Sequence, residues 1–175
     1  VVKPARGGSA LGVAGVDGLA ALPSALVGTY AYCEDALVER FHDGVDVSVI
    51  VLETDDGLRS LEPVAIEYEK GHEFDFSARY TAEFVSLTRP ELTDEQLDRL
   101  GEVARQAHRT LGLRDVSRSD FIVEADGSFV VLETAITPGT TETSVFPFAC
   151  TASGTSLGEV AHDLLRRAIA AGPPA

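Results

Sequence analysis

The sequence predicts an α+β fold, with antiparallel strands and helices in separate stretches of the chain. Three observations support it. Two strand-like runs, Asp115–Ala125 and Ser128–Ala135, flank Asp126-Gly127, the strongest short signal for a two-residue hairpin turn. Val45–Thr54 alternates apolar and polar residues as a half-buried strand does. Leu92–Leu113 carries apolar residues at helical spacing.

The first part of the chain predicts a strand, a loop, a second strand and a helix. Val1–Lys3 reads as the end of a strand, Pro4–Ala10 is a glycine-containing loop, and Leu11–Val16 is a second apolar strand. Asp17 can cap a helix that runs to about Tyr30. Pro23 should bend or interrupt that helix, because it lacks the backbone N–H.

The middle of the chain is rich in β-branched residues and favours strands. Ala36–Phe41 is predicted as a strand, His42–Gly44 as a turn, and Pro63–Tyr68 as another strand after Val45–Thr54. Residues Glu69–Thr81 are polar and irregular, which favours a long mobile loop over a site.

Helix signals are clearest after residue 90. Thr93 and Gln96 have the spacing of a capping box, and Gly112 lies near the helix end. The apolar stripe of this helix comprises Leu97, Leu100, Val103, Ala104 and Ala107. Ile136–Ser144 is predicted as a loop rich in Gly, Thr and Pro, and a closing helix should run from about Ser156 to Ala170.

The predicted hairpin of residues 115–135 gathers charged side chains on one face. If Ala125 faces Ser128, counting outward places Asp120 opposite Glu133, and Arg118 opposite Ala135. Directly opposed carboxylates repel each other, so a cation should lie between them, and a divalent metal suits oxygen ligands. The alternative is a surface ion network in which Arg118 alone neutralises the pair.

Apolar residues on both faces of the hairpin favour an interior position for it. One face continues as Ile122 and Val131. The opposite face carries Phe121, Val123, Val130 and Leu132. Opposed carboxylates in an interior hairpin are costly unless a cation compensates them, which favours the metal site over the surface network.

Composition narrows the classes of function. The chain has 175 residues, is 45% hydrophobic and carries a formal charge of −14, which disfavours nucleic-acid and anionic-membrane surfaces. It has no apolar run of membrane-spanning length and no signal segment, so we expect a cytoplasmic protein. Cys33 and Cys150 lack metal-ligand spacing and are expected to be buried free thiols, and the four histidines form no ligand pair.

Two loops have residues suited to phosphate or substrate. Gly7, Gly8 and Ser9 can present N–H groups and a hydroxyl to phosphate oxygens, with Lys3 and Arg6 as the cations. A plain turn with two glycines is the alternative. The loop of residues 136–144 carries five hydroxyls and follows the carboxylate strand directly, which favours a site edge over a simple surface loop.

Five segments, in this order and spacing, resemble the D-alanine–D-alanine ligases of the ATP-grasp superfamily. They are VVKPARGGSALGV, LVERFHDGVDVSV, FDFSARY, SRSDF and LETAITPGTTETSVFP. The resemblance implies an ATP-grasp fold. Residues 1–45 would be the second part of the central nucleotide-binding domain, and residues 46–175 the C-terminal catalytic domain. The family's N-terminal domain and the first part of its central domain are expected to be missing, so residues 1–175 alone should be inactive.

The resemblance also implies ATP and Mg²⁺ as cofactors. Asp120 and Glu133 would ligate magnesium, which bridges nucleotide phosphates during phosphoryl transfer. The implied nucleotide-binding residues are Lys3 at the phosphates, Glu39 and Asp46 at the adenine and ribose, and Arg79 at the γ-phosphate.

Further residues are implied to act in catalysis and acceptor binding. Arg118 and the backbone of Gly139 would stabilise the oxyanion of a tetrahedral intermediate. Ser9 and Tyr80 would help to close the loop of residues 69–81 over the reaction. Ser144 and Val145 would line the site of the acceptor D-alanine. Read without the family, Glu39 and Asp46 are solvated strand-face charges, Ser9 and Ser144 are turn residues, and Tyr80 is a packed tyrosine.

Three positions depart from the family pattern. Ala135 stands where the family has an asparagine that completes a second magnesium site, and a methyl group cannot ligate a metal. Arg79 stands in place of a lysine and differs from it in geometry. Ala10 replaces a second serine. The second magnesium should therefore be weakly bound or held by water.

The function implied is an ATP-dependent carboxylate–amine ligase, which makes an acyl phosphate and then a dipeptide for peptidoglycan precursors. The alternatives are a degenerate ATP-grasp module that binds nucleotide or a partner without catalysis, and a related ligase with another amino-acid substrate. Expected partners are ATP, D-alanine or a similar amino acid, and the missing N-terminal domain, with a homodimer as a candidate assembly. No nucleic acid or membrane partner is expected.

Overall fold

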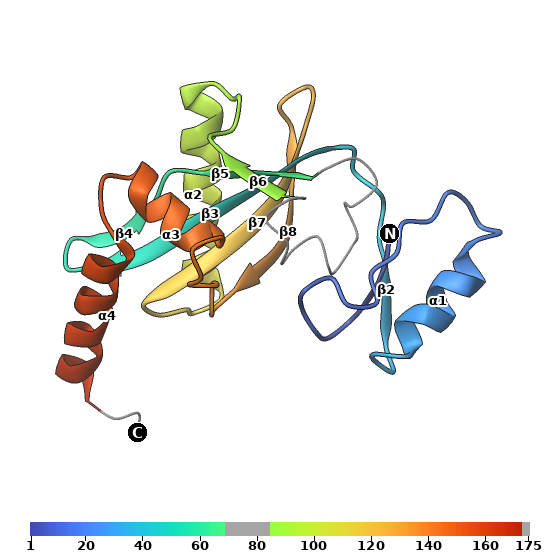
Figure 1. The fold of residues 1–175 in the computed structure, drawn as a ribbon, viewed down its shortest axis with the longest axis horizontal. Coiled ribbons are helices and arrows are strands. Elements are labelled where there is room, and N and C mark those ends of the chain that lie inside the picture. Colours follow the sequence, from blue (N-terminus) through green and yellow to red (C-terminus); the bar gives the residue numbers. More distant parts are fainter. Residues whose placement is uncertain (69–84, 173–175) are drawn as a thin grey trace. The chain divides into compact units, whose positions relative to one another are not determined.

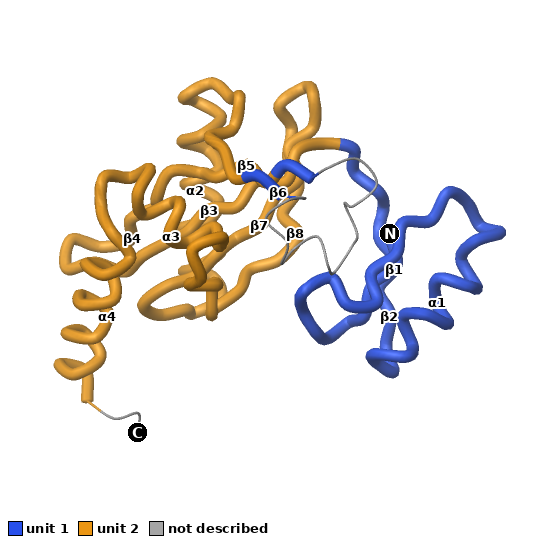
Figure 2. The backbone as a smooth tube through the Cα atoms, viewed as in Figure 1, with its two compact units in different colours: residues 1–43, 67–86 blue, residues 44–66, 87–175 orange. Residues whose placement is uncertain are grey.

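The computed structural model describes residues 1–68 and 85–172. The chain divides into two compact units (Figure 2). One unit comprises Val1–Asp43 and Glu67–Ser86, and the other comprises Gly44–Ile66 and Leu87–Ala175. The assignment of residues 1–45 and 46–175 to a central and a C-terminal domain stays a prediction. The predicted loop of residues 69–81 lies outside the described residues.

The N-terminal unit contains a small two-stranded sheet. Strand β1 (Val2–Pro4) pairs antiparallel with β2 (Ala36–Val38), so β2 is shorter than the predicted strand of residues 36–41. The strand predicted at residues 11–16 is wrong, because only Ala14 forms an isolated bridge there, to Val2. Gly12 turns the chain with φ of +73°, and a Cβ at this position would lie 2.6 Å from the Tyr32 ring. A close-packed turn therefore replaces the extended conformation.

Helix α1 (Leu22–Tyr30) has Ala21 as its N-cap, four residues after the predicted cap Asp17. Pro23 lies in its first turn, where the missing N–H needs no intrahelical partner. Gly18 has φ of +135°, which is incompatible with helix at that point. The proline therefore starts the helix, and the prediction that it would bend one was wrong.

The larger sheet has six strands in the described residues (Figure 1). The strand order is β6 (Val85–Thr88), β5 (Val64–Tyr68), β3 (Gly44–Thr54), β7 (Val116–Glu124) and β8 (Phe129–Ala135), and β4 (Gly57–Ser60) also pairs with β3. The predicted strands in β3, β5, β7 and β8 are confirmed. Strands β4 and β6 were not predicted, since each has only four residues and no clear alternation.

Helix α2 (Asp94–Thr110) confirms the predicted helix and its capping box, in which Gln96 N–H bonds to Thr93 Oγ1 at 3.3 Å and Thr93 N–H to Gln96 Oε1 at 2.9 Å. Its apolar face covers one face of the sheet. There it packs with the odd-numbered residues of β3 and with β7 side chains. That cluster consists of Val47, Val49, Val51, Leu100, Ala104, Phe121 and Val123.

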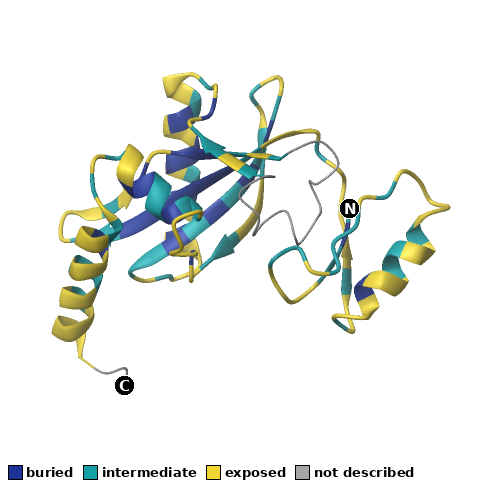
Figure 3. Ribbon diagram, viewed as in Figure 1, coloured by how far each residue is buried: buried dark blue, intermediate teal, exposed yellow. Residues whose placement is uncertain are grey.

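Helices α3 (Val145–Ala152) and α4 (Leu157–Ala171) pack with the even-numbered residues of β3. This second cluster consists of Ile50, Leu52, Leu61, Val64, Phe146, Ala149, Cys150 and Val160. Helix α4 matches the predicted closing helix, whereas α3 was not predicted. Figure 3 shows the buried residues concentrated on β3 and the helix sides that meet it. The sheet therefore has a core on each face, and no helix in the described residues is long and apolar enough to cross a membrane.

Candidate functional site

The hairpin of β7 and β8 has a longer turn than predicted, and a bulge compensates for it. Glu124 N–H bonds to Ser128 O at 2.8 Å, so the loop holds three residues, and Gly127 adopts φ of +82°. Val123 consequently pairs with Phe129, and Ile122 with Val130, one residue away from the predicted register. The register then shifts between Asp120 and Phe121. Asp120 therefore pairs with Glu133, and Arg118 with Ala135, as predicted.

The prediction of an interior hairpin is wrong for β8. This strand ends the strand order of the larger sheet, and Val131 and Leu132 are 47% and 41% exposed. Strand β7, by contrast, is covered by α2 on the face that carries Phe121 and Val123. Arg118 and Asp120 lie on the other face of β7, because side chains alternate along a strand.

Arg118 and Asp120 form a bidentate ion pair on that face. Arg118 Nε donates to Asp120 Oδ1 at 2.8 Å, and Nη2 donates to Oδ2 at 2.7 Å. Glu133 Oε1 lies 3.6 Å from Arg118 Nη2. The side chains of Arg118 and Asp120 are 23% and 17% exposed, against 59% for Glu133. Arg118 thus compensates a half-buried carboxylate and faces a second, exposed one.

Ser48, a residue that the sequence did not single out, completes the surroundings of Asp120. It lies on β3 directly opposite Asp120, and its Oγ donates to Asp120 Oδ1 at 2.7 Å. Its side chain is buried, with 1% of the residue exposed. No sequence signal links the two residues, because they are 72 positions apart and meet only through strand pairing.

The residues present fit one divalent cation. Asp120 and Glu133 project carboxylates from opposed positions on neighbouring strands, and oxygen ligands suit Mg²⁺. Mg²⁺ is commonly held by one or two carboxylates together with phosphate oxygens and water, so these two side chains suffice. A site of protein ligands alone is not formed, since the described residues contain no cluster of three or more His, Cys, Asp or Glu side chains suited to a metal.

No additional side-chain ligand for a second cation lies in this part of the hairpin. Ala135 occupies the position opposite Arg118, and its methyl group has no donor atom. Thr134 lies opposite Ser119 on the face covered by α2, where the two hydroxyls lie 3.0 Å apart. The hydroxyl of Thr134 is therefore engaged away from Glu133.

The loop after β8 is held close to the start of α3. The hydroxyls of Thr141 and Ser144 lie 2.8 Å apart, and Ser144 N–H bonds to Thr141 O at 2.9 Å. A Cβ at Gly139 would lie 2.7 Å from Ser144 Oγ, so a side chain at this position would require the Ser144 hydroxyl to move. Ser144 is the residue before α3, and Val145 packs against the core beside it. Three of the predicted residues, Gly139, Ser144 and Val145, are thus brought together.

In the N-terminal unit, two predicted nucleotide-binding residues contact each other. Lys3 Nζ and Glu39 Oε2 form an ion pair at 2.6 Å, since Lys3 on β1 lies next to the end of β2. Ser9 and Ala10 both have φ of +58°, so the glycine-containing loop holds two successive left-handed residues. Consecutive N–H groups in such a turn can face an anion.

Asp46 is on β3, paired with Ile66 and Ile122 in the larger sheet. Arg79 and Tyr80 lie outside the described residues.

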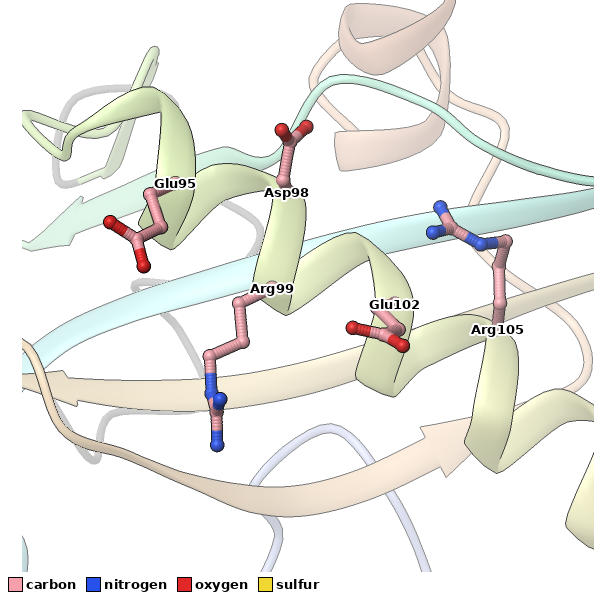
Figure 4. Close-up of a pocket in the computed structure, with 5 residues that line it drawn as sticks. All are labelled: Glu95, Asp98, Arg99, Glu102 and Arg105. Carbon is pink, nitrogen blue, oxygen red and sulfur yellow. The ribbon is translucent and has the colours of Figure 1, made fainter.

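A charged depression lies on the outer side of α2 (Figure 4). It is lined by Glu95, Asp98, Arg99, Glu102 and Arg105, which project from successive turns of one helix. Helix α2 covers the sheet face opposite to that of Asp120. This depression is the solvated side of an amphipathic helix, with charges of both signs.

Residues 1–166 match the family profile described as "D-ala D-ala ligase C-terminus". Among curated proteins, the chain is 38% identical over 175 residues to a D-alanine–D-alanine ligase of Corynebacterium aurimucosum, with 97% of this chain and 49% of that protein covered. It is 32% identical over 169 residues to the enzyme of Streptomyces griseus, with 96% and 43% covered. The chain therefore spans about half the length of the curated relatives that it matches.

Solved structures have the same fold. The VanG D-Ala:D-Ser ligase of Enterococcus faecalis matches with a TM-score of 0.80 at 26% identity, over 94% of this chain and 48% of that one. The D-alanine–D-alanine ligase of Coxiella burnetii matches with a TM-score of 0.79 at 20% identity, over 94% and 43%. The predicted α+β, ATP-grasp fold is thereby confirmed.

Proposed function

The chain belongs to the D-alanine–D-alanine ligase family, and we propose that it forms the C-terminal catalytic part of an ATP-dependent ligase. The reaction would activate the carboxylate of one D-alanine as an acyl phosphate. The amine of a second amino acid then attacks, phosphate leaves, and a dipeptide for peptidoglycan precursors forms. The half of the relatives' length that the chain does not match would hold the first amino acid.

The ion cluster of Arg118, Asp120 and Glu133 carries this proposal. The Arg118 guanidinium is half-buried, and its hydrogen bonds to Asp120 orient it. A guanidinium in that setting can stabilise an oxyanion on a tetrahedral intermediate. Asp120 and Glu133 would hold Mg²⁺, which when bound neutralises charge on the nucleotide phosphates.

Four residues would contact the nucleotide. Lys3 would contact its phosphates, with Glu39 and Asp46 at the adenine and ribose and Arg79 at the γ-phosphate. The ion pair between Lys3 and Glu39 supports this role for Lys3, because it holds the ammonium group at the strand end. Ser9 and Tyr80 would help to close the active site, and the successive left-handed residues at Ser9 and Ala10 are suited to an anion.

The acceptor amino acid would lie at the turn before α3. Ser144 and Val145 would line its site, and the backbone of Gly139 would assist Arg118 at the oxyanion. The close approach of Gly139 to Ser144 supports a shared site for these residues. The D-Ala:D-Ser ligase among the similar structures makes D-serine a second acceptor to test against D-alanine.

The test uses the polypeptide that contains this chain together with the remaining half of a ligase. ADP formation from ATP should require an added D-amino acid and Mg²⁺. Arg118→Ala should lower kcat on the order of 10²–10³-fold, as removal of one oxyanion donor does elsewhere. Arg114→Ala is the matched control, because Arg114 pairs with Asp115 on an exposed part of the same region. Equal activity of both variants would refute the role of Arg118.

A catalytically inactive ATP-grasp module is the second candidate. Ala135 favours it, because no side-chain oxygen stands opposite Arg118 to support a second cation. Such a module would bind ATP without turning it over in the presence of D-alanine or D-serine. ATP binding by calorimetry without amino-acid-dependent phosphate release would establish the module and exclude the ligase.

A further inference from the structure

We propose that Ser48 is a positioning residue, which fixes the Asp120 carboxylate for divalent-cation binding. The proposal rests on the proposed function of Asp120 as a metal ligand. Strand β3, in the centre of the sheet, would thereby contribute one residue to the site. The other side chains of the site come from the hairpin of β7 and β8.

The contact between Ser48 and Asp120 joins the central strand β3 to its neighbour β7. Ser48 is 1% exposed and pairs with Asp120 across β3 and β7. Its neighbours on β3, Val47 and Val49, face the opposite side and are fully packed under α2. The strand therefore cannot rotate to move the hydroxyl, and Ser48 Oγ stays aimed at Asp120 Oδ1 at 2.7 Å.

Ser48 and Arg118 together fill the acceptor capacity of the Asp120 carboxylate. A carboxylate offers about four acceptor positions on two oxygens. Oδ1 accepts from Ser48 Oγ and Arg118 Nε, and Oδ2 accepts from Arg118 Nη2 and, at 3.1 Å, from Arg118 Nε. The carboxylate is thus held in one orientation. A cation would bind at Oδ2, which Ser48 does not contact, in place of the bonds from Arg118.

Ser48 and Arg118 differ in how firmly they hold Asp120. Arg118 has a long side chain and is 23% exposed, so it can turn toward a substrate oxyanion. Ser48 is buried and short, and it cannot leave. Ser48 therefore keeps Asp120 in place when Arg118 releases it, which a cation ligand requires during turnover. Hydrogen-bond partners of metal ligands commonly contribute 10–100-fold to metal affinity.

Ser119 provides a matched control. It is also a fully buried serine that bonds across strands, but its hydroxyl meets Thr134 on the face covered by α2. Loss of either hydroxyl should cost comparable stability, because each removes one hydrogen bond between a buried serine and a partly buried partner. Only the Ser48 hydroxyl touches Asp120.

The experiment titrates the protein with Mn²⁺ alone and follows free Mn²⁺ by electron paramagnetic resonance. Ser48→Ala should weaken Mn²⁺ affinity by about 10-fold. Ser48→Thr should retain it by supplying the same hydroxyl, and Ser119→Ala should leave it unchanged. Ser48→Cys, a weak donor of similar volume, should show the loss even if the alanine variant does not fold.

Wild-type affinity in both Ser48→Ala and Ser48→Cys would overturn the proposal, as would an equal loss in Ser119→Ala. The absence of Mn²⁺ binding by the unmodified protein would overturn it too. Mn²⁺ binding that depends on Ser48, in a protein without amino-acid-dependent ADP formation, would refute the ligase function and leave the role of Ser48 intact.

Discussion

Arg118 holds Asp120 through two nitrogens, with Nη2 at 2.7 Å from Oδ2 and Nε at 2.8 Å from Oδ1. Both side chains are less than a quarter exposed, so solvent screens the pair only partly. The same guanidinium lies 3.6 Å from Glu133. One cationic side chain therefore compensates two opposed carboxylates, which would otherwise destabilise the hairpin.

Replacing Arg118 should destabilise the fold as well as the site. Arg118→Ala leaves Asp120 half-buried without its cation, and charged hydrogen bonds are worth about 1.5–3 kcal/mol each. We expect the free energy of unfolding to fall by about 2 kcal/mol, measured by urea denaturation. Arg114→Ala, which breaks an exposed pair, should cost less than about 1 kcal/mol. Equal losses would show that Asp120 does not depend on Arg118.

Restoring a ligand opposite Arg118 should strengthen cation dependence. Ala135→Asn adds an amide oxygen on the face of Glu133, and we expect half-maximal ADP formation at about tenfold lower Mg²⁺, equivalent to about 1.4 kcal/mol. The measurement is steady-state turnover at limiting Mg²⁺ in the complete ligase. Thr134→Asn places the same amide on the other face and should not produce this gain. An unchanged Mg²⁺ requirement in Ala135→Asn would contradict the role assigned to position 135.

The capping box of α2 should be worth a measurable part of the stability. Thr93→Ala removes the hydroxyl that bonds to Gln96 N–H, and loss of an N-cap typically costs about 1 kcal/mol. Thermal unfolding followed by circular dichroism would report the change. Thr93→Ser keeps the hydroxyl and should stay within a few tenths of a kcal/mol of the unmodified protein. A loss of equal size in the serine variant would assign the effect to the methyl group.

The two thiols should differ in reactivity. Burial raises the pKa of Cys150, with a smaller opposing effect from Arg59, whereas Cys33 is only partly buried. At pH 8 an aromatic disulfide reagent should therefore modify Cys33 first, and Cys150 only after denaturant is added. Because the pKa of Cys150 is higher in the folded state, its contribution to stability is present at neutral pH and is lost as pH rises above the ordinary thiol range. Equal labelling rates in the folded protein would contradict this.

The hairpin of β7 and β8 shows which features of strand pairing can be predicted from neighbouring residues. Asp126-Gly127 marks the turn correctly, but the turn has one residue more than the dipeptide indicates. Hydrogen bonds from the Ser128 side chain and N–H lower the pKa of Asp126 and support that longer loop. Asp120 still faces Glu133, because the bulge near Leu132 restores the register. The bulge has no clear sequence signal. The predicted pairing of Asp120 with Glu133 was correct because the extra turn residue and the bulge compensate each other.

Elements without strong periodicity were missed. Strands β4 and β6 are four residues long and depend on their partners in the sheet. Helix α3 has apolar residues on all sides and a proline in its first turn, so it has no amphipathic stripe. It forms because Phe146, Ala149 and Cys150 fill the core beside β3.

The sequence by itself determined the long amphipathic helix with its capping box, the alternating central strand and the family motifs, since each of these is encoded by neighbouring residues. It also placed Arg118, Asp120 and Glu133 on one face of a hairpin. Only the tertiary structure decided that α2 covers the other face of β7, that β8 is exposed, and that Ser48 touches Asp120. Strand order and long-range pairing decide these contacts, and alternation within one strand does not specify which strand lies beside it.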